Sequence, residues 1–293
     1  MHTRSTAIHF IVALFLLVAT ASRGDDAGLT KELTEKGAKL TETKGVITGF
    51  DLPDPTKWSD DDFKKIGQLS HVQKLGFGLG LTNHQLSLLT HLPEVTAFTT
   101  NGAQLDDDGV RQLAKFKNLT FLTFFHPGQK FTGVGLADLA ALPKLESIRV
   151  GGSRVFGNEG VAAIGKLSHL KNLHIYHCHF DSQGLAALKE LKDLRSLLLN
   201  YKPVTLQGDA AMAHLSAVKS LESITLVEER LPLADLSLLK QLPALKSLTL
   251  TGIDIPESDV AKLKAELPSA QIKWATPTPM ELQRIQTVLD AKY

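Results

Sequence analysis

The 293-residue chain has one cysteine, few aromatic side chains (6%) and almost no net charge. Because Cys178 has no second cysteine to pair with, no disulfide within the chain can hold the fold together. Lys and Arg number 32 and Asp and Glu number 31, so the formal net charge is +1. A chain so close to neutrality has no electrostatic attraction for nucleic acid or for an anionic membrane surface. We therefore expect neither as a partner.

The motifs of common catalytic sites are also missing. The sequence has no Gly-x-Ser-x-Gly, no His-Glu-x-x-His and no Cys-x-x-Cys. Glycines do alternate between Lys74 and Gly80, but they follow a predicted strand and do not form a loop before a helix, as phosphate binding would require. We expect a protein without enzymatic activity and without a cofactor.

The one long apolar run lies at the N-terminus. Arg4 precedes apolar residues 8–18, and Ala19-Thr20-Ala21 has the small-x-small pattern of a cleavage site. The run is shorter than the roughly 20 residues that span a bilayer. We expect residues 1–21 to be a signal peptide, cleaved on export to a periplasm, a cell surface or the medium, with no membrane insertion afterwards. An uncleaved anchor is the alternative.

One apolar pattern, Leu-x-x-Leu-x-Leu or a variant with Ile, Val or Phe, recurs nine times. The first positions are 23 to 27 residues apart. They are Ile47, Val72, Val95, Leu119, Leu145, Leu170, Leu194, Leu221 and Leu245. A period in this range predicts a solenoid, because a single unit cannot bury its own apolar face.

Each unit changes period halfway. The Leu-x-Leu half alternates like a strand, and the following stretch has apolar residues at every third position, as in Leu136, Leu139 and Leu142. Strand then helix, repeated, gives parallel strands. Since strands pack about 4.8 Å apart and helices about 10 Å apart, the array must bend. We expect an α/β solenoid, a horseshoe with a concave parallel sheet and convex helices.

The ends depart from the repeat. We expect residues 22–46 to form an N-terminal cap, with a helix over 29–37 and a hairpin turn over 42–45. The solenoid of about nine units then covers 47–274, and the tail, 275–293, has a helical pattern and either docks or extends into solvent. Acidic clusters at 106–108, 181–183 and 257–259 are predicted to cap helices and not to bind metal.

The repeats resemble those of leucine-rich-repeat proteins of the ribonuclease-inhibitor-like class, in the form common among exported bacterial proteins. The resemblance covers about residues 29–274 and is strongest at Phe180–Leu188 and Leu267–Trp274. It implies the horseshoe fold and a binding scaffold, without naming the ligand. The family's polar turn residue is poorly kept here, since this column includes Pro127, Cys178 and Ile253. We therefore expect an irregular solenoid.

The open face of the predicted sheet has a distinct centre. Gly and Thr dominate both ends, whereas aromatic, His and Arg side chains gather in the middle four units. This mixture is typical of an interface hot spot. The candidate ligand-binding residues are Phe121, Phe125, His126, Arg149, His174, Tyr176, His177, Asn200 and Tyr201. Gly151 and Gly152 are predicted to leave a hollow for a side chain or a sugar ring.

We interpret this centre as a surface for a protein or peptide, on a monomer. Binding of an envelope glycan is the alternative, and a third possibility is an architectural protein whose aromatic residues only cover the sheet. The histidines and cysteine between His174 and His179 suggest zinc or copper. Strand alternation, however, points Ile175 into the core and sends His177 into the turn, so three ligands cannot converge. We expect no metal.

Overall fold

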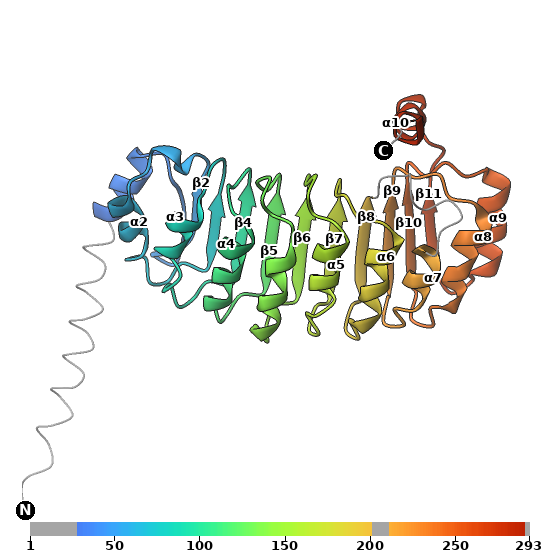
Figure 1. The fold of residues 1–293 in the computed structure, drawn as a ribbon, viewed down its shortest axis with the longest axis horizontal. Helices are drawn as coiled ribbons and strands as arrows, with labels where there is room; N and C mark the ends of the chain where they lie inside the picture. The colour runs from blue at the N-terminus through green and yellow to red at the C-terminus, as the bar shows by residue number, and fades with distance from the viewer. Residues whose placement is uncertain (1–27, 201–210, 291–293) are drawn as a thin grey trace, which may run out of the picture.

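The computed structural model describes residues 28–200 and 211–290, which form one sheet of eleven strands in sequence order (Figure 1). β1 pairs antiparallel with β2, and every later pairing is parallel. The strands are β1 Lys39–Thr43, β2 Val46–Leu52, β3 Lys74–Phe77, β4 Ala97–Asn101, β5 Phe121–Phe125, β6 Ser147–Gly151, β7 Asn172–Tyr176, β8 Ser196–Asn200, β9 Ser223–Val227, β10 Ser247–Thr251 and β11 Gln271–Trp274. The predicted solenoid is confirmed.

Helical segments cover one face of this sheet and lie in front of it in Figure 1. The α-helices are α2 Asp60–Ile66, α3 Asn83–Ser87, α4 Asp107–Gln112, α5 Asn158–Ile164, α6 Ser182–Leu185, α7 Ala211–Ser216, α8 Leu233–Leu236, α9 Glu257–Glu266 and α10 Pro279–Asp290. The 3₁₀ segments are η1 Pro55–Lys57, η2 Leu113–Lys115, η3 Val134–Ala141, η4 Ala186–Glu190 and η6 Ser237–Gln241. The opposite face of the sheet, here called the open face, carries no repeat helix of the described residues.

Several convex segments are 3₁₀ and not α-helical, which the sequence analysis did not distinguish. In η3, Leu136 and Leu139 are three residues apart and both fully buried, and a 3₁₀-helix places such residues on one line. The α-helix α5 has the same spacing, since Val161 and Ile164 are also fully buried. A spacing of three therefore does not by itself select 3₁₀ geometry.

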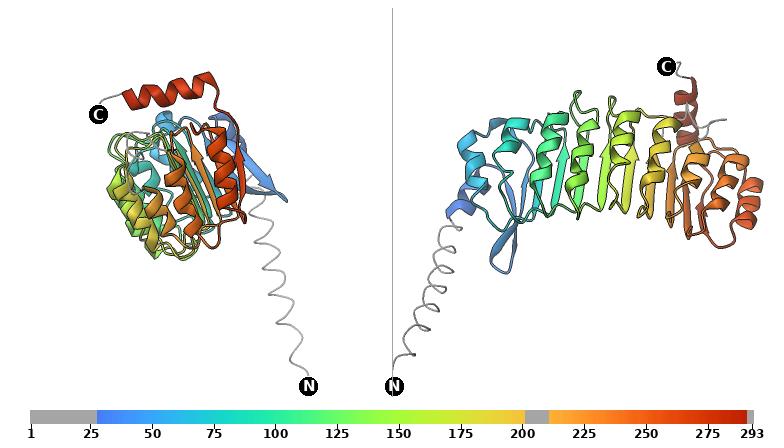
Figure 2. Two further views of the ribbon diagram at one scale, coloured as in Figure 1. Left: turned by 90° about the vertical axis from the view of Figure 1, so that its right-hand side faces the viewer. Right: turned by 60° about the horizontal axis from the view of Figure 1, so that its bottom comes forward.

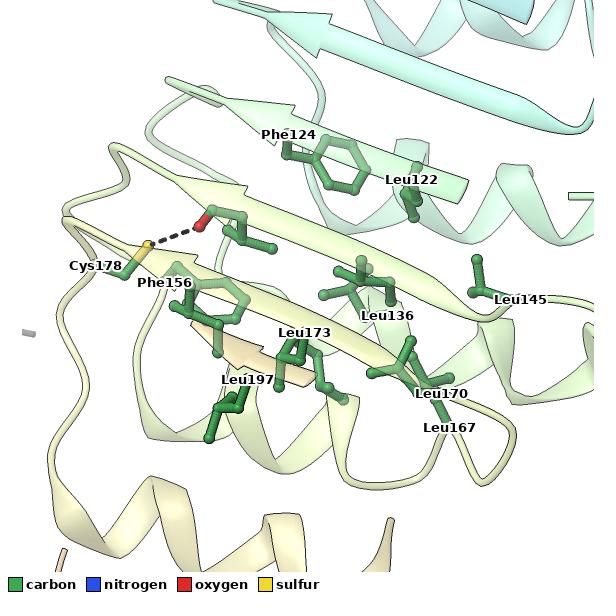
Figure 3. Packing of buried hydrophobic residues seen from close by; sticks show 14 of the residues in the cluster. Leu122, Phe124, Leu136, Leu145, Phe156, Leu167, Leu170, Leu173, Cys178 and Leu197 are labelled. Carbon is green, nitrogen blue, oxygen red and sulfur yellow. Dashed lines mark hydrogen bonds between the residues drawn. The ribbon is translucent and has the colours of Figure 1, made fainter. Parts of the chain in front are cut away.

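The core is the space between the sheet and the helical segments. Inward residues of the repeat strands are buried, and Leu122 and Phe124 on β5 are 0% exposed. Figure 3 shows these two with Leu136 and Phe156 in the layer under the sheet. Phe131 links them, since its ring centroid lies 4.8 Å from that of Phe124 and 5.9 Å from that of Phe156. Each such side chain contributes about 1.5–3 kcal/mol by leaving water.

Acidic caps begin two helices as predicted. Asp106 Oδ1 accepts hydrogen bonds from the backbone N–H of Asp108 (2.9 Å) and Gly109 (3.0 Å), and Asp181 caps α6 in the same way. Asn83 of the preceding unit also donates to Asp106 Oδ1 (2.6 Å), which ties neighbouring units together. The prediction for residues 257–259 is wrong: these residues form the first turn of α9, and Pro256 precedes it without a side-chain cap.

Each end of the sheet has its own closing element. Residues 28–35 are helical, and the hairpin of β1 and β2 turns through Lys44 and Gly45, both in the left-handed conformation (φ 53° and 80°). At the other end, α10 lies beyond the carboxyl ends of the last strands (Figure 2). Ile285 of α10 is 1% exposed, and Arg284 Nη1 donates to Glu228 Oε1 at 2.7 Å. The tail helix therefore docks on the solenoid.

In the two described ranges, no helix is long and apolar enough to cross a bilayer. The predicted signal peptide, residues 1–21, lies outside the described residues.

Cys178 is fully buried, and we predict that it does not react in the folded protein. Its Sγ lies 3.4 Å from the carbonyl oxygen of Tyr176 and 4.0 Å from that of Val150 (Figure 3). Burial raises the pKa of the thiol to about 12, so at pH 8 almost no reactive thiolate is present. A thiol reagent should label the native protein at least about a hundredfold more slowly than the urea-unfolded protein. Equal labelling rates would contradict this placement.

Candidate functional site

Five of the predicted site residues come together on the open face of three adjacent strands. Phe121 and Phe125 lie on β5, Arg149 on β6, and His174 and Tyr176 on β7. All five are half-buried, because strand alternation directs them away from the core. The parallel register aligns Thr123 with Arg149 and His174 in one row, and Phe125 with Gly151 and Tyr176 in the next. We call these five residues the platform.

Arg149 lies over an aromatic ring. Its guanidinium carbon is 5.2 Å from the centroid of Phe121, which is a cation–π arrangement. The Nε atom of Arg149 is buried and has no hydrogen-bond partner. Thr123, beside it on β5, is only 2% exposed. The guanidinium of Arg149 thus lies against the Phe121 ring, with its Nε donor removed from water.

His174 is the neighbour of Arg149 on β7. Burial lowers the pKa of His174, and the positive charge of Arg149 lowers it further. The imidazole is therefore neutral at pH 7, and Arg149 is the one permanent charge of the platform. A neutral imidazole can both donate and accept a hydrogen bond.

Aromatic rings fill the platform row that contains Phe125, Gly151 and Tyr176. The centroids of Phe125 and Tyr176 lie 5.6 Å apart, with 52° between the ring planes. A Cβ atom on Gly151 would lie 2.2 Å from Cζ of Tyr176, so the tyrosine ring covers this glycine. The predicted hollow is therefore wrong. A glycine without a side chain lets a neighbouring ring pack directly on the backbone, and the surface between Phe125 and Tyr176 is continuous.

His126 and His177 follow the platform strands at the carboxyl edge of the sheet. Both are exposed, and both have left-handed backbones (φ 44° and 51°), at the repeat position where other units have glycine. This conformation costs a non-glycine residue about 1–2 kcal/mol. His126 Nδ1 lies 3.1 Å from Asn101 Oδ1, and the His177 ring meets Tyr176 edge-on with centroids 5.8 Å apart. Glu228 has the same left-handed conformation at the equivalent position (φ 54°), so this conformation belongs to the turn of the repeat.

Two predicted site residues do not join the platform as exposed groups. Asn200, at the end of β8, is only 6% exposed, and its Nδ2 donates to the carbonyl oxygen of Val227 at 3.2 Å. It braces β8 against β9. Tyr201 lies outside the described residues.

The segment from His174 to His179 does not gather metal ligands. His174 projects from the open face, Cys178 is buried, and His177 is exposed beyond the strand. In the described part of the chain, no three His, Cys, Asp or Glu side chains are grouped to hold a metal ion.

One hollow that the sequence did not indicate lies at the C-terminal end. It has a volume of about 440 Å³ and lies between the last strands and the start of α10. Its lining includes Thr249, Thr251, Lys273, Trp274 and Glu281. The helical pattern of the tail was visible in the sequence, but nothing there specified where the helix docks.

Measured protonation of His174 tests the electrostatics of the platform. An NMR titration should give His174 a pKa below that of the same histidine in the unfolded chain, about 6.5. Arg149→Gln should raise it part of the way, because burial remains. Because the pKa of His174 is lower in the folded state, the unfolded chain binds a proton at a higher pH than the folded protein does. The free energy of unfolding should therefore decrease as the pH falls below about 6.5. A normal or raised pKa would contradict the packing.

Gly151→Ala tests whether Tyr176 covers the glycine. The added methyl group should push the tyrosine ring away and break its pairing with Phe125, at a cost of about 0.5–1.5 kcal/mol in urea unfolding. Gly128→Ala is the matched control, because its Cβ would meet nothing closer than 3.4 Å. The expected NMR shifts of the Phe125 and Tyr176 rings should appear only in the first variant. Unchanged ring signals in Gly151→Ala would mean that the two rings are not packed there.

Neither a protein-family model nor a curated protein matches this chain. Solved structures similar to it include an internalin, inlF, of Listeria monocytogenes, with 16% identity over 73% of this chain and 57% of that chain (TM-score 0.49). Internalin C2 of the same organism has 15% identity over 74% and 84% (TM-score 0.44). The leucine-rich-repeat ectodomain of the Arabidopsis receptor kinase HAESA, in complex with a peptide hormone, has 14% identity (TM-score 0.50).

The HAESA match covers 86% of this chain and 45% of the receptor chain. This chain thus spans less than two thirds of the HAESA and inlF chains that it matches. At such low identities the likeness concerns the fold alone. Together with the sheet order and the regular parallel register, it shows that the chain folds as an α/β leucine-rich-repeat solenoid.

Proposed function

We propose that this protein is a non-catalytic binding scaffold that recognises a protein or peptide through the platform. The observation that carries the proposal is the concentration of Phe121, Phe125, Arg149 and Tyr176 on three adjacent strands. Aromatic and arginine side chains dominate the energetics of protein interfaces, especially where they are packed and partly desolvated.

The sheet supplies the rigidity that such a surface needs. Each platform residue sits on a strand that is bonded on both sides and backed by fully buried side chains such as Leu122, Ile148 and Leu173. Ring–ring and cation–π contacts further restrict the side chains before any ligand arrives. Binding to a preorganised surface loses less conformational entropy, so more of the contact energy appears as affinity.

Export and the ribonuclease-inhibitor-like class belong to the same proposal. Residues 1–21 carry the signal-peptide pattern, and the repeat lengths of 23 to 27 residues suit this class. The HAESA ectodomain was solved with a peptide hormone, which supports peptide recognition here by analogy of fold. We propose a monomer that acts outside the cytoplasm.

Recognition of an envelope glycan is the second candidate. Phe125 and Tyr176 offer adjoining half-exposed rings, and sugar rings stack on such surfaces. A glycan ligand would be displaced by soluble saccharides, whereas a protein or peptide ligand would not.

Capture of partners with matched variants tests the proposal. The chain from Ser22 onward is immobilised and exposed to an envelope extract of its own cells, as wild type and as Phe125→Ala/Tyr176→Ala. The control is Leu79→Ala/Met280→Ala, which removes two exposed apolar side chains (66% and 64%) away from the platform. We expect a protein that the wild type and the control retain and that the platform variant loses at least about tenfold.

The other outcomes are equally informative. Equal capture by wild type and platform variant would place binding elsewhere and overturn the proposal. Release by soluble saccharides would favour the glycan. Absence of any specific partner for a folded wild-type protein would favour an architectural role.

A further inference from the structure

Arg149 forms no ion pair in the described part of the chain, where most arginines do. Six arginines lie in the described ranges, and four of them form ion pairs. The pairs are Arg111 with Asp108 and Asp138, Arg195 with Glu222, Arg230 with Asp254, and Arg284 with Glu228. The other two are Arg149 and Arg154, and only Arg149 is half-buried. A partly desolvated cation without a counterion is unfavourable unless a ligand supplies one.

The described outward strand positions around Arg149 carry no acidic side chain. Outward positions of β4 to β8 hold Ala97, Thr99, Asn101, Phe121, Thr123, Phe125, Ser147, Arg149, Gly151, Asn172, His174, Tyr176, Ser196, Leu198 and Asn200. No Asp, Glu or Lys occurs among them. His174 is the titratable group beside Arg149, and it is neutral at pH 7 because burial and Arg149 lower its pKa. Among the described outward positions of β4 to β8, Arg149 is therefore the one permanent positive charge.

The geometry of Arg149 suits a carboxylate. The guanidinium carbon lies 5.2 Å from the Phe121 ring centroid, which restricts the side chain, while Nε is buried without a partner. A guanidinium held in this way presents a fork of parallel N–H donors, and a carboxylate accepts two of them at once. The neutral imidazole of His174 in the adjacent position can donate a further hydrogen bond.

Apolar rings flank the charge in both directions along the strand. Phe121 begins β5 and Phe125 ends it, so their Cα atoms are about 13 Å apart at 3.3 Å per residue. The backbone of Arg149 pairs in register with Thr123, midway between them, and its guanidinium extends over the Phe121 ring, which stays half-exposed. A ligand that uses the whole row needs an acidic group in its middle and apolar groups on both sides. A chain terminus would leave one side of the row uncovered.

We propose that the platform recognises an extended protein segment with an internal Asp or Glu flanked by apolar side chains. This inference rests on the proposed function and names the chemistry of its ligand. The carboxylate pairs with Arg149, and the flanking side chains pack on Phe121 at one end and on Phe125 and Tyr176 at the other.

Short blocked peptides test the inference directly. The probes are acetyl-Phe-Gly-Glu-Gly-Phe-amide, whose three side chains share one face of an extended chain, and the same peptide with Gln in place of Glu, titrated into the ¹⁵N-labelled protein at millimolar concentration. The Glu peptide should bind about tenfold more tightly than the Gln peptide and should shift the Nε–Hε signal of Arg149. In Arg149→Gln the two peptides should bind equally. Arg154→Gln is the matched control and should keep the preference, because Arg154 is exposed beyond β6.

Three results would overturn the inference. They are equal binding of both peptides to the wild type, no response to the Glu peptide, and an unchanged preference in a folded Arg149→Gln variant. Tighter binding of the Gln peptide with a free C-terminal carboxylate would assign Arg149 to a chain end instead. The proposed function is tested separately, because a captured partner that is lost in Phe125→Ala/Tyr176→Ala but kept in Arg149→Gln would uphold the platform and reject the acidic segment.

Discussion

Burial of the inward side of every strand is the constraint on which the rest of the structure depends. Each strand from β3 to β11 has only four or five residues, so a single unit cannot cover its own apolar side chains and is stable only against its neighbours. Leu122 and Phe124 of one unit, for example, complete a core with Phe131 and Phe156 of later segments. Because these contacts pass from unit to unit, the whole array stabilises each position within it.

The same constraint creates the surface on the other side. Inward residues at alternate positions force the residues between them outward, and an unbroken parallel register aligns these outward residues into rows. Each row therefore consists of residues from different units that occupy the same position in the repeat. Arg149 and His174 are 25 residues apart in sequence but neighbours in space for this reason. A one-residue slip would move Arg149 into the core, so the fold protects the platform from rearrangement.

Most of the fold could be predicted from the sequence, because period and alternation are local patterns. The inward positions, the parallel order and the caps at Asp106 and Asp181 all follow from spacing and residue type. The choice between α and 3₁₀ geometry on the convex side was not predictable from spacing, because buried residues three apart occur in both η3 and α5. The position of α10 depends on long-range contacts such as Arg284 with Glu228, which no local pattern encodes.

The sequence predicted which residues lie together in the candidate site, but not how all of their side chains are oriented. Register alone places Phe121, Phe125, Arg149, His174 and Tyr176 together. It does not say that Tyr176 lies over Gly151, nor that Asn200 turns to a backbone carbonyl, because side-chain rotations follow from packing in three dimensions. The pairing of Arg149 with an aromatic ring in place of a carboxylate likewise became apparent only with the structure.

Hydroxyl-radical footprinting of the protein with its captured partner tests the central claim most directly. Mass spectrometry would compare the oxidation of each side chain in the free and bound states. The account predicts protection concentrated at Phe121, Phe125, His174 and Tyr176, with Leu79 and Met280 oxidised equally in both states. Protection confined to the convex helical segments or to α10, with the platform as accessible as before, would contradict it.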